Sequence, residues 1–159
     1  MANPHENYMK LALREAQKAA DRDEVPVGAV IVRDGEIISR AFNRRETDHN
    51  PCAHAELLAI WKAAKKLGGW RLTRCQLYVT LEPCPMCAGA ILNARIEAVY
   101  FGARDPKAGC FGSLCDLNAL PFNHHPLIWG GILEPECAQI LKSYFQQKRR
   151  IKKEQKKEG

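Results

Sequence analysis

The sequence predicts an α/β fold, in which a mixed sheet of about five strands is flanked by helices. Helical and strand patterns alternate along the chain, and the later strand patterns, residues 76–81 and 97–101, are separated by a helical one. Strands joined by a helical crossover are parallel, whereas the two earlier strand patterns are joined by Asp34-Gly35, a hairpin turn signal. With 159 residues and 46% hydrophobic content, we expect one domain.

The first elements are a helix followed by a hairpin. Asn3-Pro4-His5-Glu6 combines a cap residue, a proline at the first helical position and a glutamate three residues after the cap. Apolar residues then recur at helical spacing, so this helix should run to about Ala20. Residues 25–32 are apolar and rich in β-branched side chains, and residues 36–42 continue as a second strand.

The later elements follow from the same signals. Proline and glycine mark their ends, and apolar periodicity marks their interiors. In chain order we expect a polar loop over 43–53, a helix from His54 to Gly68-Gly69, a strand over 76–81, a helix over 85–94, a strand over 97–101, an irregular segment over 102–126, an edge strand over 127–133 interrupted by Gly130-Gly131, and a final helix from Glu134.

Positive charge is concentrated at the carboxyl end. Residues 146–159 hold seven lysines or arginines against two glutamates, a net +5 of the chain's +6. A basic segment of this kind suits a phosphate backbone, because binding releases condensed counterions, although a solvated helix end is the plainer interpretation. We therefore divide the chain into a domain over 1–145 and a basic helical tail over 146–159 that belongs to the same domain.

Nothing in the sequence indicates a membrane protein. No stretch approaches the roughly 20 apolar residues of a membrane span, and the start of the chain lacks a signal-peptide pattern. The seven cysteines are an odd number in a chain too long to need disulfide staples. We expect a cytoplasmic protein in which some thiols bind metal.

Two short motifs predict the chemistry. They are His54-Ala55-Glu56 at one helix start and Pro83-Cys84-Pro85-Met86-Cys87 at another. Zinc prefers imidazole and thiolate ligands, and three protein ligands, His54, Cys84 and Cys87, leave the fourth tetrahedral position for water. That arrangement is typical of a catalytic zinc site with one ion per subunit. A purely structural zinc or metal-free thiols are the alternatives.

Glu56 is the candidate for proton transfer. Zinc lowers the pKa of bound water toward about 7, so that a nearby carboxylate can accept its proton. Glu56 would then pass a proton to a ring nitrogen of a base and help ammonia leave. His-x-Glu followed by Pro-Cys-x-x-Cys is the pattern of zinc deaminases that act on nucleobases.

The other cysteines give weaker indications. Cys52 lies close enough to His54 in sequence to be a conceivable fourth ligand, but an incidental loop thiol is the preferred interpretation. Cys110 and Cys115 are too isolated to indicate a second metal. Cys75 and Cys137 are expected to be buried as small apolar residues.

Beyond the zinc motif, the chain resembles the bacterial tRNA-specific adenosine deaminases, which convert the wobble adenosine of the anticodon to inosine. The resemblance covers nearly the whole chain. It implies a three-layer α/β/α fold of the cytidine-deaminase type, a homodimer with catalytic pockets near the subunit interface, and a tRNA anticodon stem-loop as partner. The matching segments are residues 24–30, 42–44, 80–84, 101–105 and 122–124.

The resemblance also implies RNA-contacting residues. Asn43 would touch the flipped nucleotide, and Asp105 and Asn123 its neighbours in the loop; ordinary turn or capping roles are the alternatives. The remaining residues implied to lie near RNA are Tyr144, Phe145, Arg149 and Arg150, of which Phe145 could instead belong to the core. Two departures from the family pattern are Cys52, where a small polar residue is usual, and a 116–123 interval that is one residue short.

Two other functions remain open from the sequence. The same zinc scaffold could deaminate free guanine or cytosine bases or nucleosides, which need no phosphate contacts. The chain could also be a zinc-stabilised RNA-binding module without catalytic activity.

Overall fold

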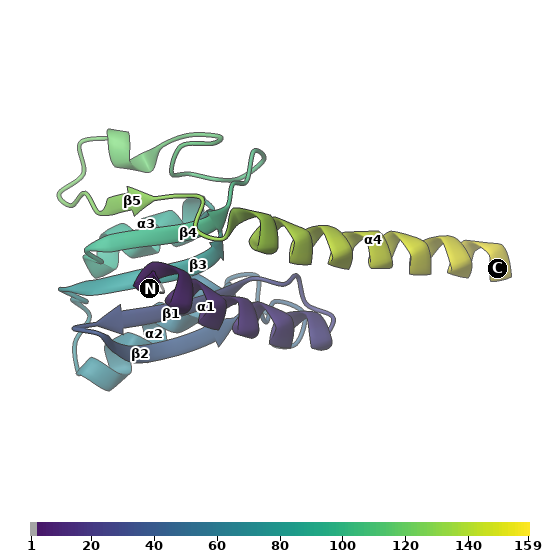
Figure 1. The fold of residues 1–159 in the computed structure, drawn as a ribbon, viewed down its shortest axis with the longest axis horizontal. Helices are drawn as coiled ribbons and strands as arrows, with labels where there is room; N and C mark the ends of the chain where they lie inside the picture. Colours follow the sequence, from purple (N-terminus) through teal and green to yellow (C-terminus); the bar gives the residue numbers. More distant parts are fainter. Residues whose placement is uncertain (1–2) are drawn as a thin grey trace.

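The computed structural model describes residues 3–159 as a five-stranded mixed sheet with helices on both faces, which confirms the predicted fold class (Figure 1). Met1 and Ala2, part of the start examined above for a signal pattern, lie outside the described residues. The strand order is β2-β1-β3-β4-β5. In chain order the elements are α1 (Pro4–Asp21), β1 (Gly28–Arg33), β2 (Glu36–Phe42), α2 (Ala55–Leu67), β3 (Cys75–Leu81), α3 (Pro85–Ala94), β4 (Ala98–Ala103), the 3-10 helix η1 (Leu117–Ala119), β5 (Leu127–Trp129) and α4 (Glu134–Glu158).

The first two strands form the predicted hairpin. β1 and β2 pair antiparallel, and the turn between Arg33 and Glu36 contains Asp34 and Gly35 with φ of 51° and 76°. A two-residue turn with positive φ at both positions matches the right-handed twist of the strands that it joins. Gly35 accepts this backbone conformation without strain.

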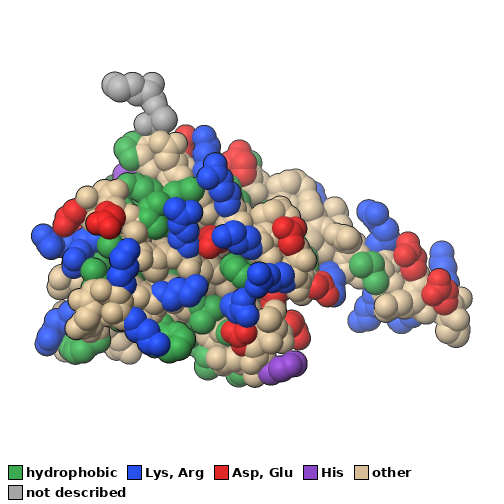
Figure 2. All heavy atoms as spheres, turned by 90° about the horizontal axis from the view of Figure 1, so that it is seen from below, with side chains coloured by type: hydrophobic (Ala, Val, Ile, Leu, Met, Phe, Trp, Pro, Cys, Tyr) green, Lys and Arg blue, Asp and Glu red, His purple; other side chains and the backbone are tan. Residues whose placement is uncertain are grey.

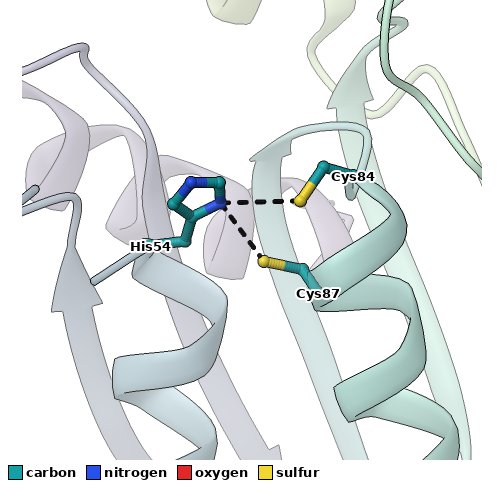
Figure 3. A group of neighbouring side chains, drawn as sticks. All are labelled: His54, Cys84 and Cys87. Atoms are coloured by element: carbon teal, nitrogen blue, oxygen red, sulfur yellow. Dashed lines mark hydrogen bonds between the residues drawn. The ribbon is translucent and has the colours of Figure 1, made fainter. Parts of the chain in front are cut away.

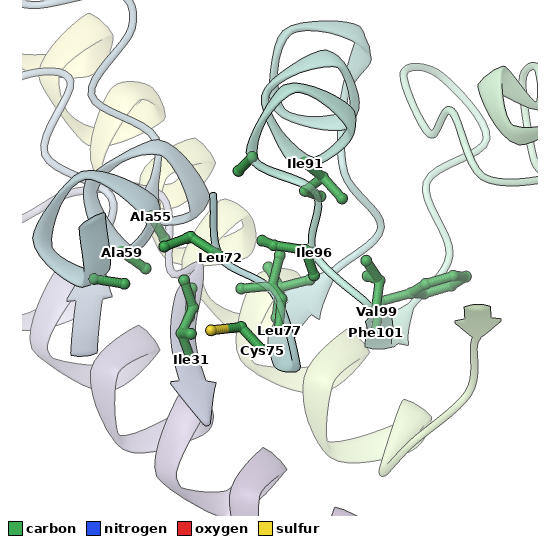
Figure 4. Close-up of a cluster of buried hydrophobic side chains, with 14 of the residues drawn as sticks. Ile31, Ala55, Ala59, Leu72, Cys75, Leu77, Ile91, Ile96, Val99 and Phe101 are labelled. Atoms are coloured by element: carbon green, nitrogen blue, oxygen red, sulfur yellow. The ribbon is translucent and has the colours of Figure 1, made fainter. Parts of the chain in front are cut away.

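Side-chain alternation along β1 explains the three layers. Ile31 belongs to a core cluster that includes Ala55 and Ala59 of α2 and Ile91 of α3 (Figure 4). Its neighbours Val30 and Val32 face the opposite way, into a second cluster with residues of α1 and α4. Because successive strand residues point to opposite faces, a strand that is apolar at each position from Ala29 to Val32 needs helices on both sides.

The parallel part of the sheet positions the functional site. β3, β4 and β5 run parallel, with α3 as the crossover between β3 and β4, as predicted. The carboxyl ends of parallel strands meet at one edge of a sheet, and loops at that edge form ligand sites in α/β folds. The segments that follow β3 and β4 at this edge contain Cys84 and Asp105.

Two predicted strands were wrong at one end. The first begins at Gly28 rather than at residue 25, because Pro26 has no N–H to pair and Val27 donates its N–H to the carbonyl of Val25. The edge strand ends at Trp129 rather than at residue 133, because Gly131 adopts a φ of 88° that breaks the extended backbone.

The last helix is long and projects from the body of the molecule. α4 runs without a break from Glu134 to Glu158, and every residue from 146 onward is exposed. Figure 2 shows lysine and arginine side chains clustered on this projecting end, with acidic ones between them. Among residues 3–159, the helices lack the combination of length and apolar character that spanning a bilayer requires.

Candidate functional site

Two helix starts bring the predicted zinc ligands together. His54 is the N-cap of α2, Cys84 is the N-cap of α3, and Cys87 lies in the first turn of α3 after Pro85. Neither cap side chain hydrogen-bonds to its own helix, so both remain free to point at one another (Figure 3). The two helices pack side by side on the same face of the sheet, which holds the three side chains in one place.

The spacing of the ligand atoms fits a tetrahedral zinc ion. Nδ1 of His54 lies 3.6 Å from Sγ of Cys84 and 3.4 Å from Sγ of Cys87, and the three atoms lie within 4.8 Å of one another. With zinc–sulfur and zinc–nitrogen bonds of their usual lengths, a tetrahedron requires a nitrogen–sulfur separation of about 3.6 Å. The residues therefore fit the group, and the fourth corner has no protein ligand among residues 3–159.

The electrostatics of the three ligands favour one thiolate beside the imidazole. The hydrogen bond from Cys87, and then that with His54, lowers the pKa of the Cys84 thiol, while the pKa of Cys87 is raised. The interaction with Cys84 also raises the pKa of His54. The amino termini of α2 and α3 add a partial positive charge that stabilises thiolate further.

Glu56 lies in the first turn of α2, two residues after His54, and is only 4% exposed. Burial raises the pKa of its carboxyl group to about 7. A group that titrates near neutral pH can both accept and release a proton at little cost, as a general acid–base catalyst must. Glu56 is not one of the three clustered ligand residues.

A cavity of about 220 Å³ opens over these residues and is lined by His54, Glu56 and Cys84. This volume is below the roughly 300–1,000 Å³ of pockets for drug-sized ligands, so it suits one small ring system. Its other lining residues include three apolar ones, Val25, Val27 and Leu81, and three polar ones, Asn43, Arg45 and Asp105.

Asn43 and Asp105 both line the cavity and also stabilise local turns. The Asn43 amide donates to the carbonyl of Val25 at 3.2 Å and accepts from the Arg45 N–H at 3.3 Å. The Asp105 carboxylate accepts the N–H groups of the two residues after Pro106. Both residues therefore have the turn-forming role that the sequence left open, and both also contribute polar atoms to the lining of the cavity.

The other predicted RNA-contacting residues do not line this cavity. Asn123 is exposed in the loop before β5, and Arg149 and Arg150 are exposed on the projecting part of α4. Phe145 is 42% exposed and packs edge-on against Tyr144, so it is not a core residue. Tyr144 in turn donates its hydroxyl to Asp23, which also pairs with Lys148 and fixes α4 to the end of α1.

Two buried glutamates were not identified from the sequence. Glu24, 1% exposed, accepts hydrogen bonds from the N–H groups of Glu46 and Thr47 and from the Thr47 hydroxyl. Glu82, 2% exposed, similarly binds the loop after β4. Burial alone would raise the pKa of both carboxyls, but these hydrogen bonds outweigh it and hold each pKa below its ordinary value. Both lie in segments that carry the resemblance, yet sequence does not distinguish a buried glutamate from an exposed one.

The remaining cysteines lie outside the ligand cluster. Cys75 and Cys137 are fully buried, as predicted. Cys52 is exposed, which favours the incidental loop thiol over a fourth ligand. Cys115 donates its thiol hydrogen to the sulfur of Cys110 at 3.2 Å, a contact between two thiols that the sequence had not indicated.

Comparison with protein families supports a zinc-binding region in this chain. Residues 2–103 match the family described as the cytidine and deoxycytidylate deaminase zinc-binding region. The chain is 54% identical over 149 residues to the tRNA-specific adenosine deaminase of Bacillus subtilis, covering 93% of this chain and 92% of that one. It is 48% identical over 144 residues to the tRNA-specific adenosine deaminase of Agrobacterium fabrum, covering 90% and 95% respectively.

Solved structures of deaminases also match this chain. One from a study of A-to-I editing by tRNA:A34 deaminases superposes with a TM-score of 0.81 and 46% identity, over 85% of this chain and 99% of that chain. A guanine deaminase from Bacillus subtilis superposes with a TM-score of 0.61 and 46% identity, but over only 65% of this chain and 66% of that one. The tRNA deaminase thus matches over more of both chains.

Proposed function

Because the chain belongs to the cytidine and deoxycytidylate deaminase family, and within it groups with the tRNA-specific adenosine deaminases, we propose that it hydrolyses the wobble adenosine of a tRNA anticodon to inosine. One observation above all supports this proposal. A buried carboxylate, Glu56, lines one small cavity together with His54 and Cys84, two of the three side chains at zinc-ligand spacing. A free-base deaminase would need no more than this cavity. The two relatives from Bacillus subtilis and Agrobacterium fabrum, which match over at least 90% of both chains, are enzymes named for tRNA, and this favours an RNA substrate.

The three ligands and Glu56 have distinct roles in this reaction. His54, Cys84 and Cys87 would hold one zinc ion per subunit. The ion would lower the pKa of a water molecule in the cavity. Glu56 accepts a proton from that water at a carboxylate oxygen and delivers it to a ring nitrogen of adenine. The water oxygen bonds to C6, and Glu56 then takes the second proton from the hydroxyl group now on C6. It passes this proton to the amino nitrogen as the bond from C6 to that nitrogen breaks, so that ammonia leaves and a C6 carbonyl remains.

The size of the cavity explains why the target base has to leave the base stack of the anticodon loop. A volume of about 220 Å³ accepts one base ring, so the target nucleotide must turn out of the anticodon loop. Val25, Val27 and Leu81 would give the ring apolar contact, while Asn43, which also lines the cavity, is proposed to bind the nucleotide. Asp105 and Asn123 are proposed to contact the neighbouring nucleotides.

We propose that the substrate is an anticodon stem-loop rather than a free base. A comparison of kcat/KM for the two kinds of substrate tests this. The enzyme should form inosine from a synthetic anticodon stem-loop with kcat/KM at least about 10³-fold above that for free adenosine, guanine or cytosine, because binding energy from remote phosphates is used at the reacting centre. Inosine is measured by mass spectrometry of the digested RNA. Efficient deamination of a free base with none on RNA would overturn the tRNA proposal.

The basic tail is proposed to bind the RNA backbone. Phe145, Arg149 and Arg150 all lie exposed on α4, where an aromatic ring and two guanidinium groups can meet a base and phosphates. We assign residues 1–145 to the deaminase domain and 146–159 to this tail of the same domain.

Replacing Arg149 and Arg150 together by alanine should weaken stem-loop binding roughly 10-fold at low salt. It should also make the slope of log K against log salt shallower by about 1 to 2, since about 0.9 counterion is released per phosphate contact. Binding is measured by fluorescence anisotropy across a salt series. The control is Lys10→Ala on α1, which should leave the slope unchanged; an unchanged slope in the double variant would argue against tail contacts.

We propose that the protein acts as a homodimer in the cytoplasm. Large apolar side chains at Leu114, Leu120 and Phe122 are 47–57% exposed, and such exposed groups are typical of interaction surfaces. Sedimentation equilibrium should give the mass of two 17.9 kDa chains, and a monomer at micromolar concentration would contradict the dimer.

A further inference from the structure

Glu82 is a buried carboxylate whose hydrogen-bond partners all come from one loop. It lies directly after β3 and is 2% exposed. Oε1 accepts from the Asp105 N–H and the Ser113 hydroxyl, and Oε2 accepts from the N–H groups of Phe111 and Ser113 at 3.1 Å each. No lysine or arginine pairs with it among residues 3–159. The loop alone therefore compensates for the burial of this charge.

The loop that Glu82 binds is also a wall of the catalytic cavity. Asp105 and Ala108 line that cavity, on the side that Glu82 itself borders. The N–H of Cys110 donates to the carbonyl of Pro83 at 2.9 Å, next to the zinc-ligand residue Cys84. Glu82 and Pro83 thus connect this wall directly to the metal-binding segment.

Gly109 shows how closely the loop approaches the carboxylate. A Cβ atom at this position would lie 2.4 Å from Cδ of Glu82 and 2.6 Å from the carbonyl oxygen of Asp105. Such contacts are too short for any real side chain, and the Glu82 carboxylate cannot easily retreat because four hydrogen bonds hold it. Glycine is needed here for space, so that the loop can wrap around the carboxylate.

We propose that Glu82 is a positioning residue for substrate binding, which fixes the wall bearing Asp105 and Ala108 at a set distance from the zinc ligands. A buried ionised carboxylate without partners is costly, so any loop conformation that withdraws these N–H groups is disfavoured. Glu82 acts through the loop and does not touch the reacting atoms. The inference rests on the proposed function, because it takes the cavity as the site for the flipped adenosine.

The test is Glu82→Gln in the full chain, with zinc content and steady-state kinetics on an anticodon stem-loop. Glutamine keeps the size of the side chain but presents an NH₂ group to N–H donors. A shift of about 1 Å in a positioning group can cost about 100-fold. We expect KM to rise by roughly 30- to 100-fold, kcat to fall less than about 5-fold, and zinc to remain at one ion per chain.

Two further variants distinguish positioning from loss of fold. Gly109→Ala keeps the charge of Glu82 but displaces the loop, and should reproduce the rise in KM. Ser113→Ala removes the hydroxyl donor and should raise KM about 3- to 10-fold, which corresponds to the net contribution of one typical hydrogen bond. Gly69→Ala, where an added Cβ meets nothing within 4 Å, is the control and should leave both constants unchanged.

The outcomes separate this inference from the proposed function. If the unaltered protein does not deaminate the stem-loop, the proposed function fails. If it does, but Glu82→Gln and Gly109→Ala leave KM unchanged or lose zinc instead, the positioning role is overturned. Should Glu82→Gln not fold, the KM of Ser113→Ala decides the question, and an unchanged KM there overturns the inference.

Discussion

Replacing Glu56 by glutamine is expected to lower kcat for inosine formation by about 10³- to 10⁴-fold while zinc and RNA binding persist, the upper range for loss of a general acid–base group. Glutamine has the shape of glutamate but cannot exchange a proton at neutral pH. The side chain is 4% exposed and adjoins the cavity, so bulk water cannot readily replace it as a proton carrier. Ammonia release and RNA inosine content measure the loss.

The result depends on Glu56 acting as a proton carrier and not as a metal ligand. Zinc content should stay at one ion per chain in Glu56→Gln and in the shorter Glu56→Ala, since the three ligands lie elsewhere. Glu36→Gln, at an exposed position on β2, is a matched control that should keep full activity. Unchanged ammonia release in Glu56→Gln would rule out the proposed role.

The zinc site was predictable from sequence because its geometry is local. Cys84 and Cys87 are three residues apart in one helical turn, so their sulfurs converge whatever the rest of the fold does. Only His54 comes from a different segment of the chain. Its position at the start of a second helix could be inferred from the motif, although the 3.4 Å and 3.6 Å contacts required the structure.

The hairpin and the crossover were predictable for a similar reason. Asp34-Gly35 determines a tight turn by its own backbone preferences, and a helix between two strands determines their parallel order. The ends of β1 and β5 were not predictable from apolar character alone. Gly28 depends on tertiary contacts, since an added Cβ would lie 2.0 Å from the carbonyl oxygen of Ala12 in α1.

The supports of the cavity were the least predictable part. Glu24 and Glu82 read as two of many charged residues, and only their burial and hydrogen-bond donors reveal that each holds a loop beside the cavity. Asn123 and Arg149 present the opposite case. A resemblance suggested them, but neither lines the cavity, and both are exposed.

Removing zinc is expected to abolish deamination and to lower thermal stability together. A ligand present at 1,000 times its Kd stabilises the folded state by about 4 kcal/mol. For a domain of this size each 1 kcal/mol corresponds to about 2–4 °C, so the unfolding midpoint should fall by roughly 8 °C or more. Calorimetry after dialysis against a chelator measures the midpoint, and readdition of Zn²⁺ should restore both properties.

Paired cysteine variants locate this effect at the predicted ligands. Cys87→Ser should lose zinc and activity, because a serine hydroxyl does not ionise as a thiol does, and the buried position offers no replacement ligand. Cys52→Ser changes the same atoms at an exposed thiol outside the ligand cluster and should retain both. Full turnover by metal-free protein would contradict zinc catalysis, whereas zinc loss in Cys52→Ser would instead mean that Cys52 fills the fourth position and the centre is closed to water.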